Sequence, residues 1–255
     1  MNPSQKVPLS VIVPTFNEEG NIEDCLQSVS WADEIIVVDG RSTDRTREKA
    51  GRYTSKILLT ENAPAEVQRL KGLKEIKHSW FFLLDADERV SEGLRSQIAE
   101  VLASGGSKSA YRVLRRNYYR NQPVHLHHPD YQLRLFRKSE MDSLPREIHR
   151  IPQVKGEVGV LKGELIHYFF TSIEDYLVKL GRYTKIDASY WRAAGKRVGG
   201  LNAFYYFVVR PKWRFFQYYF LKKGFLDGFF GLFFSLSSAF YEVMVAALVK
   251  GEEKN

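Results

Sequence analysis

The chain has 255 residues, enough for one sizeable domain with an appendage or for two small domains. Its net charge of +8 favours a polyanionic partner: nucleic acid, an anionic membrane surface or a phosphorylated substrate. The one cysteine, Cys25, excludes an internal disulfide and a cysteine-cluster metal site, and its helical pattern predicts a buried thiol. The first residues lack the apolar core of a signal peptide, so we expect the bulk of the chain to stay in the cytoplasm.

Strands and helices are predicted to alternate through roughly the first ninety residues. Short apolar runs predict strands at Leu9–Pro14, Ile35–Val38, Lys56–Leu59 and Phe81–Leu84, and a helical pattern follows each of the first three. Asn17 is expected to cap the first helix, and Ser91 is expected to cap a helix after the fourth strand. This alternation predicts an α/β fold with a Rossmann-like, mostly parallel sheet flanked by helices. Because the chain has no Gly-x-Gly-x-x-Gly motif, a dinucleotide cofactor is not expected.

The fourth predicted strand breaks abruptly into the carboxylates Asp85, Asp87 and Glu88. Asp85 and Asp87 are two residues apart, so they point to the same side of an extended backbone. The carboxyl end of a buried parallel strand is where open α/β sheets bind ligands. A divalent cation such as Mg²⁺ or Mn²⁺ would offset the repulsion between the two acids. The alternative is a solvated acidic turn.

Three motifs resemble the nucleotide-side motifs of the inverting family 2 glycosyltransferases, which have a GT-A fold. The matching segments are Val13–Glu18, Val38–Asp44 and Asp85–Glu88. A wider similarity, to the branch that includes lipopolysaccharide-core β-glucosyltransferases, covers most of the chain through Trp31–Glu34, Ala110–Arg112, Pro129–Arg137 and Gly224–Gly228. The resemblance implies transfer of a hexose from a nucleotide-sugar, most simply a UDP-sugar.

The resemblance also implies roles for individual residues. The nucleotide site would comprise Pro14, Thr15, Asn17, Glu18, Asp39, Gln68, Arg69, Asp85 and Ala86. Asp39 would accept a hydrogen bond from the base, and the alternative for it is a helix cap. Arg69 would offset diphosphate charge, although the branch usually has Asn where Leu70 follows, and its alternative is a solvated helix face. Asp87, together with Asp85, would hold Mg²⁺ or Mn²⁺.

A base is needed to deprotonate the acceptor hydroxyl. In the related branch the base position corresponds to Glu147–Arg150, where Arg150 replaces the expected carboxylate, and arginine cannot act as a base at neutral pH. The substitutes are Glu147, His149 and Asp130, of which Glu147 or His149 is our hypothesis. The alternative is a changed acceptor or a weakened enzyme. Residues 111–150 hold nine Lys and Arg against four Asp and Glu, which suits an acidic or phosphorylated glycan.

The last third of the chain is aromatic and apolar. We expect a catalytic domain over residues 1–168 and a helical, membrane-facing segment over 169–255. Aromatic residues mixed with Lys and Arg between Leu201 and Phe220 are typical of a membrane–water interface. Phe229–Val249 is long enough to span ~30 Å of hydrocarbon, but Glu242 would cost ~2.5–3.5 kcal/mol there. Helices lying in the interface, with pairing to a second copy left open, are favoured over a true span or a soluble dimer interface.

The resemblance, together with the apolar and aromatic C-terminal segment, implies a metal-dependent hexosyltransferase acting on a lipid-linked or surface glycan at the cytoplasmic face of a membrane. A polyprenyl-phosphate glycosyltransferase is the alternative, because a lipid phosphate acceptor needs little deprotonation. A nucleic-acid-binding protein is disfavoured, because the aromatic residues cluster in long apolar helices rather than in strands. A noncatalytic membrane scaffold with the same fold is the last alternative.

Overall fold

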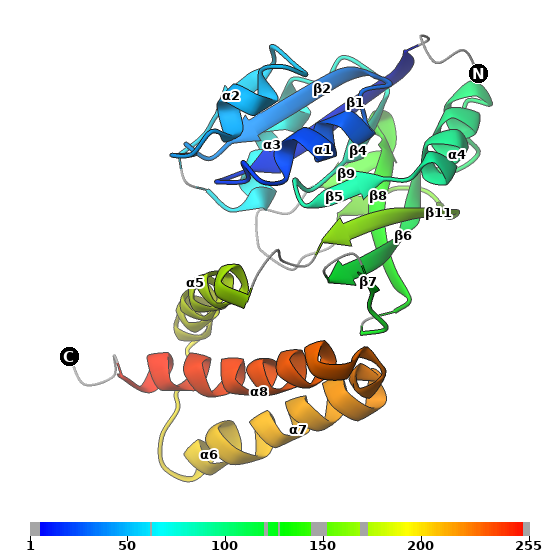
Figure 1. Ribbon diagram of the computed structural model, residues 1–255. Coiled ribbons are helices and arrows are strands. Elements are labelled where there is room, and N and C mark those ends of the chain that lie inside the picture. The colour runs from blue at the N-terminus through cyan, green and yellow to red at the C-terminus, as the bar shows by residue number, and fades with distance from the viewer. Residues whose placement is uncertain are drawn as a thin grey trace. The chain divides into compact units, whose positions relative to one another are not determined.

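The computed structural model describes residues 6–61, 63–119, 122–126, 128–143, 152–168 and 173–251. The chain forms two compact units, drawn in Figure 1. The first unit comprises Met1–Arg116 and Pro129–His167, and the second comprises Asn117–His128 and Tyr168–Asn255. The segment Asn117–His128 thus belongs to the same unit as the C-terminal part of the chain. The expected division after residue 168 assigned this segment to the catalytic domain instead.

A mixed sheet is the framework of the first unit. Its strands, nine among the described residues, run in the order β3-β2-β1-β4-β8-β6-β11-β5, and β7 pairs with the far end of β6. The strands are β1 (Val7–Thr15), β2 (Ala32–Asp39), β3 (Ile57–Leu59), β4 (Trp80–Leu83), β5 (Glu88–Val90), β6 (Ala110–Tyr119), β7 (Gln122–Pro123), β8 (Asp130–Arg137) and β11 (Val158–Tyr168). The first four in this order are parallel, whereas β8 runs antiparallel to both β4 and β6. The predicted α/β class is confirmed, with an antiparallel half added to the parallel one.

Helices cover both faces of the parallel half. They are α1 (Ile22–Ser28), α2 (Thr46–Ala50), α3 (Ala65–Lys74) and α4 (Glu92–Ala103). Alternate residues of β1 point to opposite faces, so Val11 packs with α1 and α4 while Ile12 packs on the side of α3. Strands buried on both faces read as continuous apolar runs, which is why they were predictable. A short 3-10 helix, η1 (Lys138–Glu140), and a two-stranded sheet of β9 (Met141–Ser143) and β10 (Gln153–Val154) complete this unit.

Two of the local predictions are confirmed and one is wrong. Ser91 caps α4 by accepting a hydrogen bond from the Leu94 N–H at 3.2 Å. Cys25 is fully buried, and burial raises the pKa of its thiol, which makes it unreactive. Asn17 does not cap α1, because it adopts a left-handed conformation (φ 55°) and its side-chain oxygen accepts a hydrogen bond from the Thr43 N–H instead.

The second unit is mainly helical. It contains α5 (Ile173–Ala193) and a helical hairpin, by which we mean residues 201–251. The first arm of the hairpin runs through α6 (Leu201–Phe204), the π-helical η2 (Tyr205–Val209), α7 (Arg210–Phe216) and the π-helical η3 (Gln217–Leu221). The 3-10 turn η4 (Gly224–Asp227) leads into the second arm, α8 (Gly228–Gly251), and Figure 1 shows α7 and α8 side by side. Within the described residues, Gly224–Gly251 is one helical stretch long and apolar enough to cross a membrane, with a mean hydropathy of 1.8.

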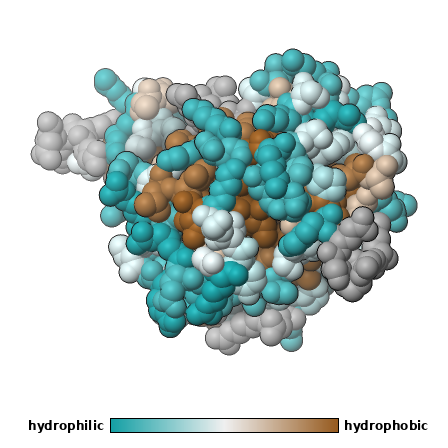
Figure 2. Space-filling model, turned by 90° about the horizontal axis from the view of Figure 1, so that it is seen from above, coloured by the Kyte–Doolittle hydropathy of each residue, from teal (hydrophilic) through white to brown (hydrophobic). Residues whose placement is uncertain are grey.

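Exposed apolar side chains are distributed unequally between the units. Figure 2 shows one face of the molecule, where hydrophilic side chains border an area of hydrophobic ones. Over the described residues, 18 of the 23 exposed large hydrophobic residues belong to the second unit. The second unit therefore exposes far more apolar surface than scattered surface residues would account for.

Candidate active site

The carboxyl ends of β1 and β2 lie side by side, and a glutamine from α3 closes on them. Thr15 pairs in register with Asp39. The Thr15 N–H donates to Gln68 Oε1 at 2.9 Å, and Gln68 Nε2 donates to the Ala63 carbonyl at 3.0 Å. A Cβ on Gly40 would lie 2.9 Å from Gln68 Nε2, so a larger residue there would displace the end of the Gln68 side chain. The structure thus brings the predicted residues Thr15, Asp39 and Gln68 together.

The loops that follow these two strands are hydrogen-bonded to each other. The Asn17 N–H donates to Ser42 Oγ at 2.9 Å, and the Asn17 side chain accepts from Thr43 at 2.8 Å. The Glu18 N–H donates to Thr46 Oγ1 at 2.8 Å. Pro14 is buried one residue before the strand end, opposite Val38. These bonds fix the backbone on which the predicted nucleotide residues sit.

Asp39 is fully buried and organises the loop after β2. Its Oδ1 accepts from the Ser42 N–H at 2.8 Å and its Oδ2 from Ser42 Oγ at 2.5 Å, while Arg47 Nε lies 3.8 Å from Oδ1. Asp39 does not cap α2, which begins at Thr46 with Arg45 as its N-cap residue, so the helix-cap alternative is wrong and the bonds to Ser42 close a turn instead. A carboxylate has about four lone-pair sites, so these bonds leave acceptor capacity for a base.

Two arginines from different elements hold Asp85. Arg69 of α3 donates to Oδ1, and Arg134 of β8 donates to Oδ2 at 2.7 Å. The same Nη2 of Arg134 lies 2.6 Å from Oε1 of the fully buried Glu88. Glu88 Oε2 in turn accepts from the Asp85 N–H at 3.0 Å. Ala86, between the two aspartates, is buried, and its carbonyl accepts from Arg89 at 3.0 Å.

The charge balance keeps Asp85 ionised. Burial alone would raise the pKa of this carboxyl, but the guanidinium groups of Arg134 and Arg69 outweigh burial and hold the pKa well below its usual range. Both arginines keep a buried Nε–H that has no acceptor among the described residues. An anionic ligand would satisfy such donors, because guanidinium groups match phosphate oxygens well.

Asp87, two residues after Asp85, lies next to a histidine. His167 Nε2 of β11 is 3.5 Å from Asp87 Oδ2. Over the described residues no three His, Cys, Asp or Glu side chains form a metal cluster. Mg²⁺ and Mn²⁺ commonly take one or two protein ligands and complete their shell with water and phosphate oxygens. Asp87 with His167 would offer such a cation a carboxylate and an imidazole, and both oxygens of Asp85 are bonded to arginines.

A comparison with known families decides what this arrangement is. The model described as glycosyl transferase family 2 matches residues 10–154, more than half of the chain, and that range includes Thr15, Asp39, Asp85 and Asp87. The chain belongs to glycosyl transferase family 2. The glycosyltransferase therefore carries its family motifs at the sheet edge just described, and the predicted GT-A fold class is confirmed.

Individual relatives differ in how much of the glycosyltransferase they match. It is 27% identical over 254 residues to the lipopolysaccharide core biosynthesis glycosyltransferase LpsC of Rhizobium meliloti (strain 1021), covering 96% of this chain and 92% of LpsC. It is 33% identical over 109 residues to the dolichol-phosphate mannosyltransferase of Pyrococcus furiosus, covering 38% of this chain and 30% of that protein. Among solved structures, glucosyl-3-phosphoglycerate synthase from Mycobacterium tuberculosis, in complex with Mn²⁺ and UDP-glucose, aligns with a TM-score of 0.49 at 16% identity, over 77% of this chain and 82% of that chain.

One of the three predicted base candidates of this glycosyltransferase can be examined directly. Asp130 Oδ2 accepts from Arg115 Nε at 2.8 Å, and its Oδ1 accepts from Gln132 at 2.6 Å. A carboxylate already bonded to a guanidinium and an amide is a weaker proton acceptor than a free one. Glu147 and His149 lie outside the described residues, so the hypothesis that one of them is the base stays a prediction.

Arg134, Glu88 and His167 are site residues that sequence reasoning did not assign. Arg134 lies between Leu133 and Leu135 in β8. Its burial among apolar neighbours would have been the available signal, since a buried arginine needs carboxylate partners. His167 is the last but one residue of β11, and no local pattern in that strand points to Asp87.

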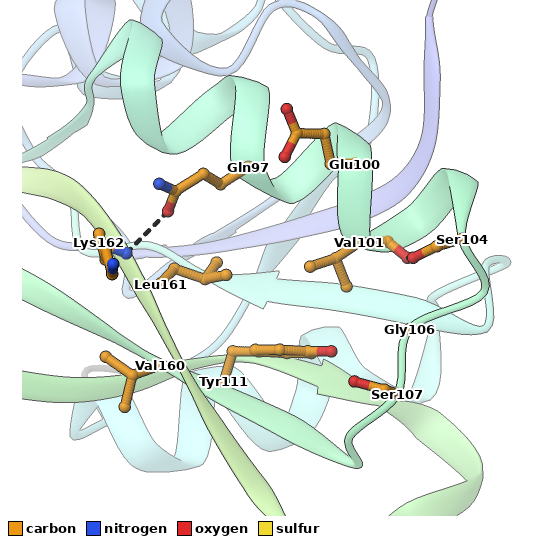
Figure 3. A pocket seen from close by; sticks show the side chains of 10 residues that line it. All are labelled: Gln97, Glu100, Val101, Ser104, Gly106, Ser107, Tyr111, Val160, Leu161 and Lys162. Carbon is orange, nitrogen blue, oxygen red and sulfur yellow. Dashed lines mark hydrogen bonds between the residues drawn. The ribbon is translucent and has the colours of Figure 1, made fainter.

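A groove elsewhere in the first unit is separate from this site. Figure 3 shows it, with a volume of about 630 Å³, between α4 and the strands β6 and β11. Its lining includes Gly106, which packs on Trp80, the first residue of β4. Asp85 follows the opposite, carboxyl end of that strand, so the groove is not where the family motifs meet. Within the groove, Gln97 Oε1 accepts from the Lys162 N–H at 2.8 Å.

Proposed function

We propose that this glycosyltransferase moves a hexose from a UDP-sugar to a lipid-linked or cell-surface glycan, such as a lipopolysaccharide core, with inversion at the anomeric carbon. One observation carries the donor assignment. Thr15, Asp39 and Asp85, which is held by two arginines, lie at the same edge of the sheet. The similarity to LpsC over nearly the whole chain supports the acceptor class.

Each part of the site then has a task toward the donor. Asp39 accepts a hydrogen bond from the uracil imide, for which its remaining lone pairs are available. Arg69 and Arg134 offer their Nε–H groups to the diphosphate. Asp87 and His167 would hold Mg²⁺ or Mn²⁺, which when bound supplies Lewis-acid stabilisation of the diphosphate leaving group.

The acceptor hydroxyl loses its proton to a base as it attacks the anomeric carbon, from the face of the sugar opposite the leaving diphosphate. A positioned base contributes typically ~10²–10⁴-fold to the rate. Because Asp130 is bonded to Arg115 and Gln132, we assign this task to Glu147 or His149. Single alanine variants at Glu147, His149 and Asp130 test this, and an Asp130 variant that alone loses turnover would reverse the assignment.

The enzyme is proposed to work as a peripheral protein at the cytoplasmic face of a membrane, where a lipid-linked acceptor would be presented. Pairing of two copies through the C-terminal helices is the further partner considered. The alternative function, transfer to a polyprenyl phosphate, draws support from the partial similarity to the dolichol-phosphate mannosyltransferase. Assaying transfer to a polyprenyl phosphate and to a core oligosaccharide lipid in parallel separates the two.

Thermal unfolding with nucleotides tests the donor and cation assignments. We expect UDP with Mn²⁺ to raise the melting temperature more than UDP alone or GDP with Mn²⁺, since a ligand stabilises the state that it binds. Asp87→Ala should abolish the Mn²⁺-dependent part. The matched control is Asp33→Ala, an exposed aspartate at the amino end of β2. Equal Mn²⁺-dependent shifts in both variants would rule out Asp87 as the cation ligand.

A further inference from the structure

The helical hairpin turns its charged acids inward. Residues 201–251 contain two acidic residues, Asp227 and Glu242, and each side chain is only 3% exposed. Glu242 lies 2.7 Å from Arg210 Nε and accepts from Arg214 Nε at 2.8 Å. Asp227 accepts from the backbone N–H groups of His125 and Leu126, at 2.7 and 2.9 Å. Glu242, the mid-helix carboxylate that argued against a membrane span, is therefore paired inside the hairpin.

Apolar side chains occupy the outside of both arms. On α8 the exposed ones recur every three or four residues, which places them on one face: Phe229, Leu232, Leu236 and Phe240. The first arm repeats the pattern with Leu201, Phe204, Tyr205, Val209, Trp213, Phe216 and Phe220. The buried side of α8 is itself mainly apolar, with Phe230, Phe234, Val245, Ala246 and Val249, so this helix carries apolar side chains on both sides, unlike a surface helix of a water-soluble protein. We call these exposed residues the apolar stripe.

The positive charge of the molecule gathers in the same unit. The second unit holds fourteen Lys and Arg against seven Asp and Glu, whereas the first holds twenty-four against twenty-three. Nearly the whole net charge of +8 thus belongs to the unit that carries the apolar stripe. With both acids of the hairpin buried, the surface that it presents is apolar and cationic, including the exposed Lys212 and Lys223.

Charge decides between the two occupants that fit an apolar face. A second copy would bring another strongly cationic unit against the first, whereas a bilayer with anionic lipids attracts juxtaposed lysines. We propose that the apolar stripe docks onto a bilayer containing anionic phospholipids, with the hairpin lying along its surface. Lys212 lies near the middle of the first arm, where a lysine reaches headgroups from a helix in the interface but would sit in the hydrocarbon of a crossing helix.

This inference rests on the proposed function only for its purpose, which is to bring the site to a lipid-borne acceptor. Docking is measured without any sugar transfer, so the two ideas fail separately. A glycosyltransferase that binds UDP but ignores vesicles would refute the docking alone.

Vesicle flotation of the full chain is the test. We expect flotation with phosphatidylcholine–phosphatidylglycerol vesicles, weaker flotation with phosphatidylcholine alone, and loss of the difference at high salt, because salt screens surface charges. Lys212→Glu with Lys223→Glu should lower the apparent affinity for the anionic vesicles by about tenfold or more. The matched control, Lys155→Glu with Lys162→Glu in the first unit, makes the same charge change at exposed positions and should leave it unchanged.

Serine replacements test the apolar part of the surface. Phe216→Ser with Phe229→Ser should lose flotation on every vesicle, while Val160→Ser, an exposed apolar residue of the first unit, should keep it. The fluorescence of Trp191 and Trp213, which belong to the second unit, checks that this unit is folded in each hairpin variant. The proposal is overturned if all variants float like the wild type, if lipid charge has no effect, or if the chain forms a stable dimer that does not float.

Discussion

Asp85 owes its fixed position to guanidinium groups from α3 and β8, two elements far apart in the chain. The carboxylate is partly shielded from water, so its charge is tolerable only while Arg69 and Arg134 stay beside it. Arg134 also contacts Glu88, which ties the turn of the motif to the antiparallel half of the sheet. Ion pairs therefore hold the turn in addition to the apolar packing of Leu84 and Ala86 in the core.

Removing Arg134 should destabilise the protein. Arg134→Met leaves Asp85 and the buried Glu88 without their shared partner, and breaking a buried pair in this way costs about 3–5 kcal/mol. Urea unfolding of the variant measures the loss. Arg45→Met is the control, because Arg45 pairs with Glu48 on the surface and should cost at most about 1 kcal/mol. Equal losses of unfolding free energy in the two variants would mean that the buried ion pairs of Arg134 stabilise the protein no more than a surface pair does.

The contribution of Asp85 to stability should depend on pH. Its folded pKa is depressed, so the contribution is present above the unfolded pKa of about 3.9 and is lost as pH falls below that value. The free energy of unfolding of Asp85→Asn should therefore fall short of the wild type at neutral pH, and the gap should narrow below about pH 4. A gap that stays constant from neutral to strongly acidic pH contradicts this assignment.

The sequence allowed one half of the site to be predicted at the level of residues. Thr15, Asp39 and Asp85 were recognisable because each ends or follows a short apolar run and belongs to a family motif. Their partners were not, because Arg134 and His167 reach the site through antiparallel pairing that no local pattern encodes. The hydrogen bond from Arg134 to Asp85 joins residues that are 49 positions apart in the chain.

At the scale of elements, the parallel half of the sheet was predictable and the antiparallel half largely was not. β1, β2 and β4 are apolar runs buried on both faces, whereas β5 consists of Glu88, Arg89 and Val90. In the sequence alone, two charged residues in a three-residue segment predict a loop. The partners that allow their burial come from distant parts of the chain, as Arg134 does for Glu88.

The approach of α3 to the sheet depends on one glycine. A Cβ on Gly72 would lie 2.5 Å from Ile12 Cγ2 and 3.1 Å from Val38 Cγ2, so an added methyl must displace the helix or the strands. Gly72→Ala should destabilise the protein by about 1–3 kcal/mol, the usual cost of overpacking. Because α3 carries Gln68 and Arg69, the same variant should weaken UDP binding.

Gly93→Ala is the matched control for that measurement. Gly93 lies in α4, and a Cβ there meets nothing within 4 Å. Alanine should stabilise a helix position of this kind by about 0.4–1 kcal/mol. Unfolding free energies that change alike in the two variants would show that helix propensity, not the contact with Ile12, decides the outcome.

At the scale of the whole molecule, two units with different ligands should unfold separately. UDP with Mn²⁺ at a hundred times its Kd should stabilise the first unit by about 2.7 kcal/mol, and anionic vesicles should stabilise the second. Each unit has two tryptophans, Trp31 and Trp80 in the first and Trp191 and Trp213 in the second, so single Trp→Phe variants assign each transition. One transition that both ligands shift equally would show that the units melt as one.

β6 is a single strand of ten residues, yet it begins in the first unit, and Asn117 to Tyr119 belong to the second. The chain thus crosses from one unit to the other after residues 116, 128 and 167. A recombination event that replaced the residues after 167 would keep Asn117–His128 but remove the helices with which that segment forms the second unit. The segments Asn117–His128 and Tyr168–Asn255 therefore have to be inherited together. A chimaera that takes its C-terminal region from a relative would need that relative's equivalent of Asn117–His128 as well.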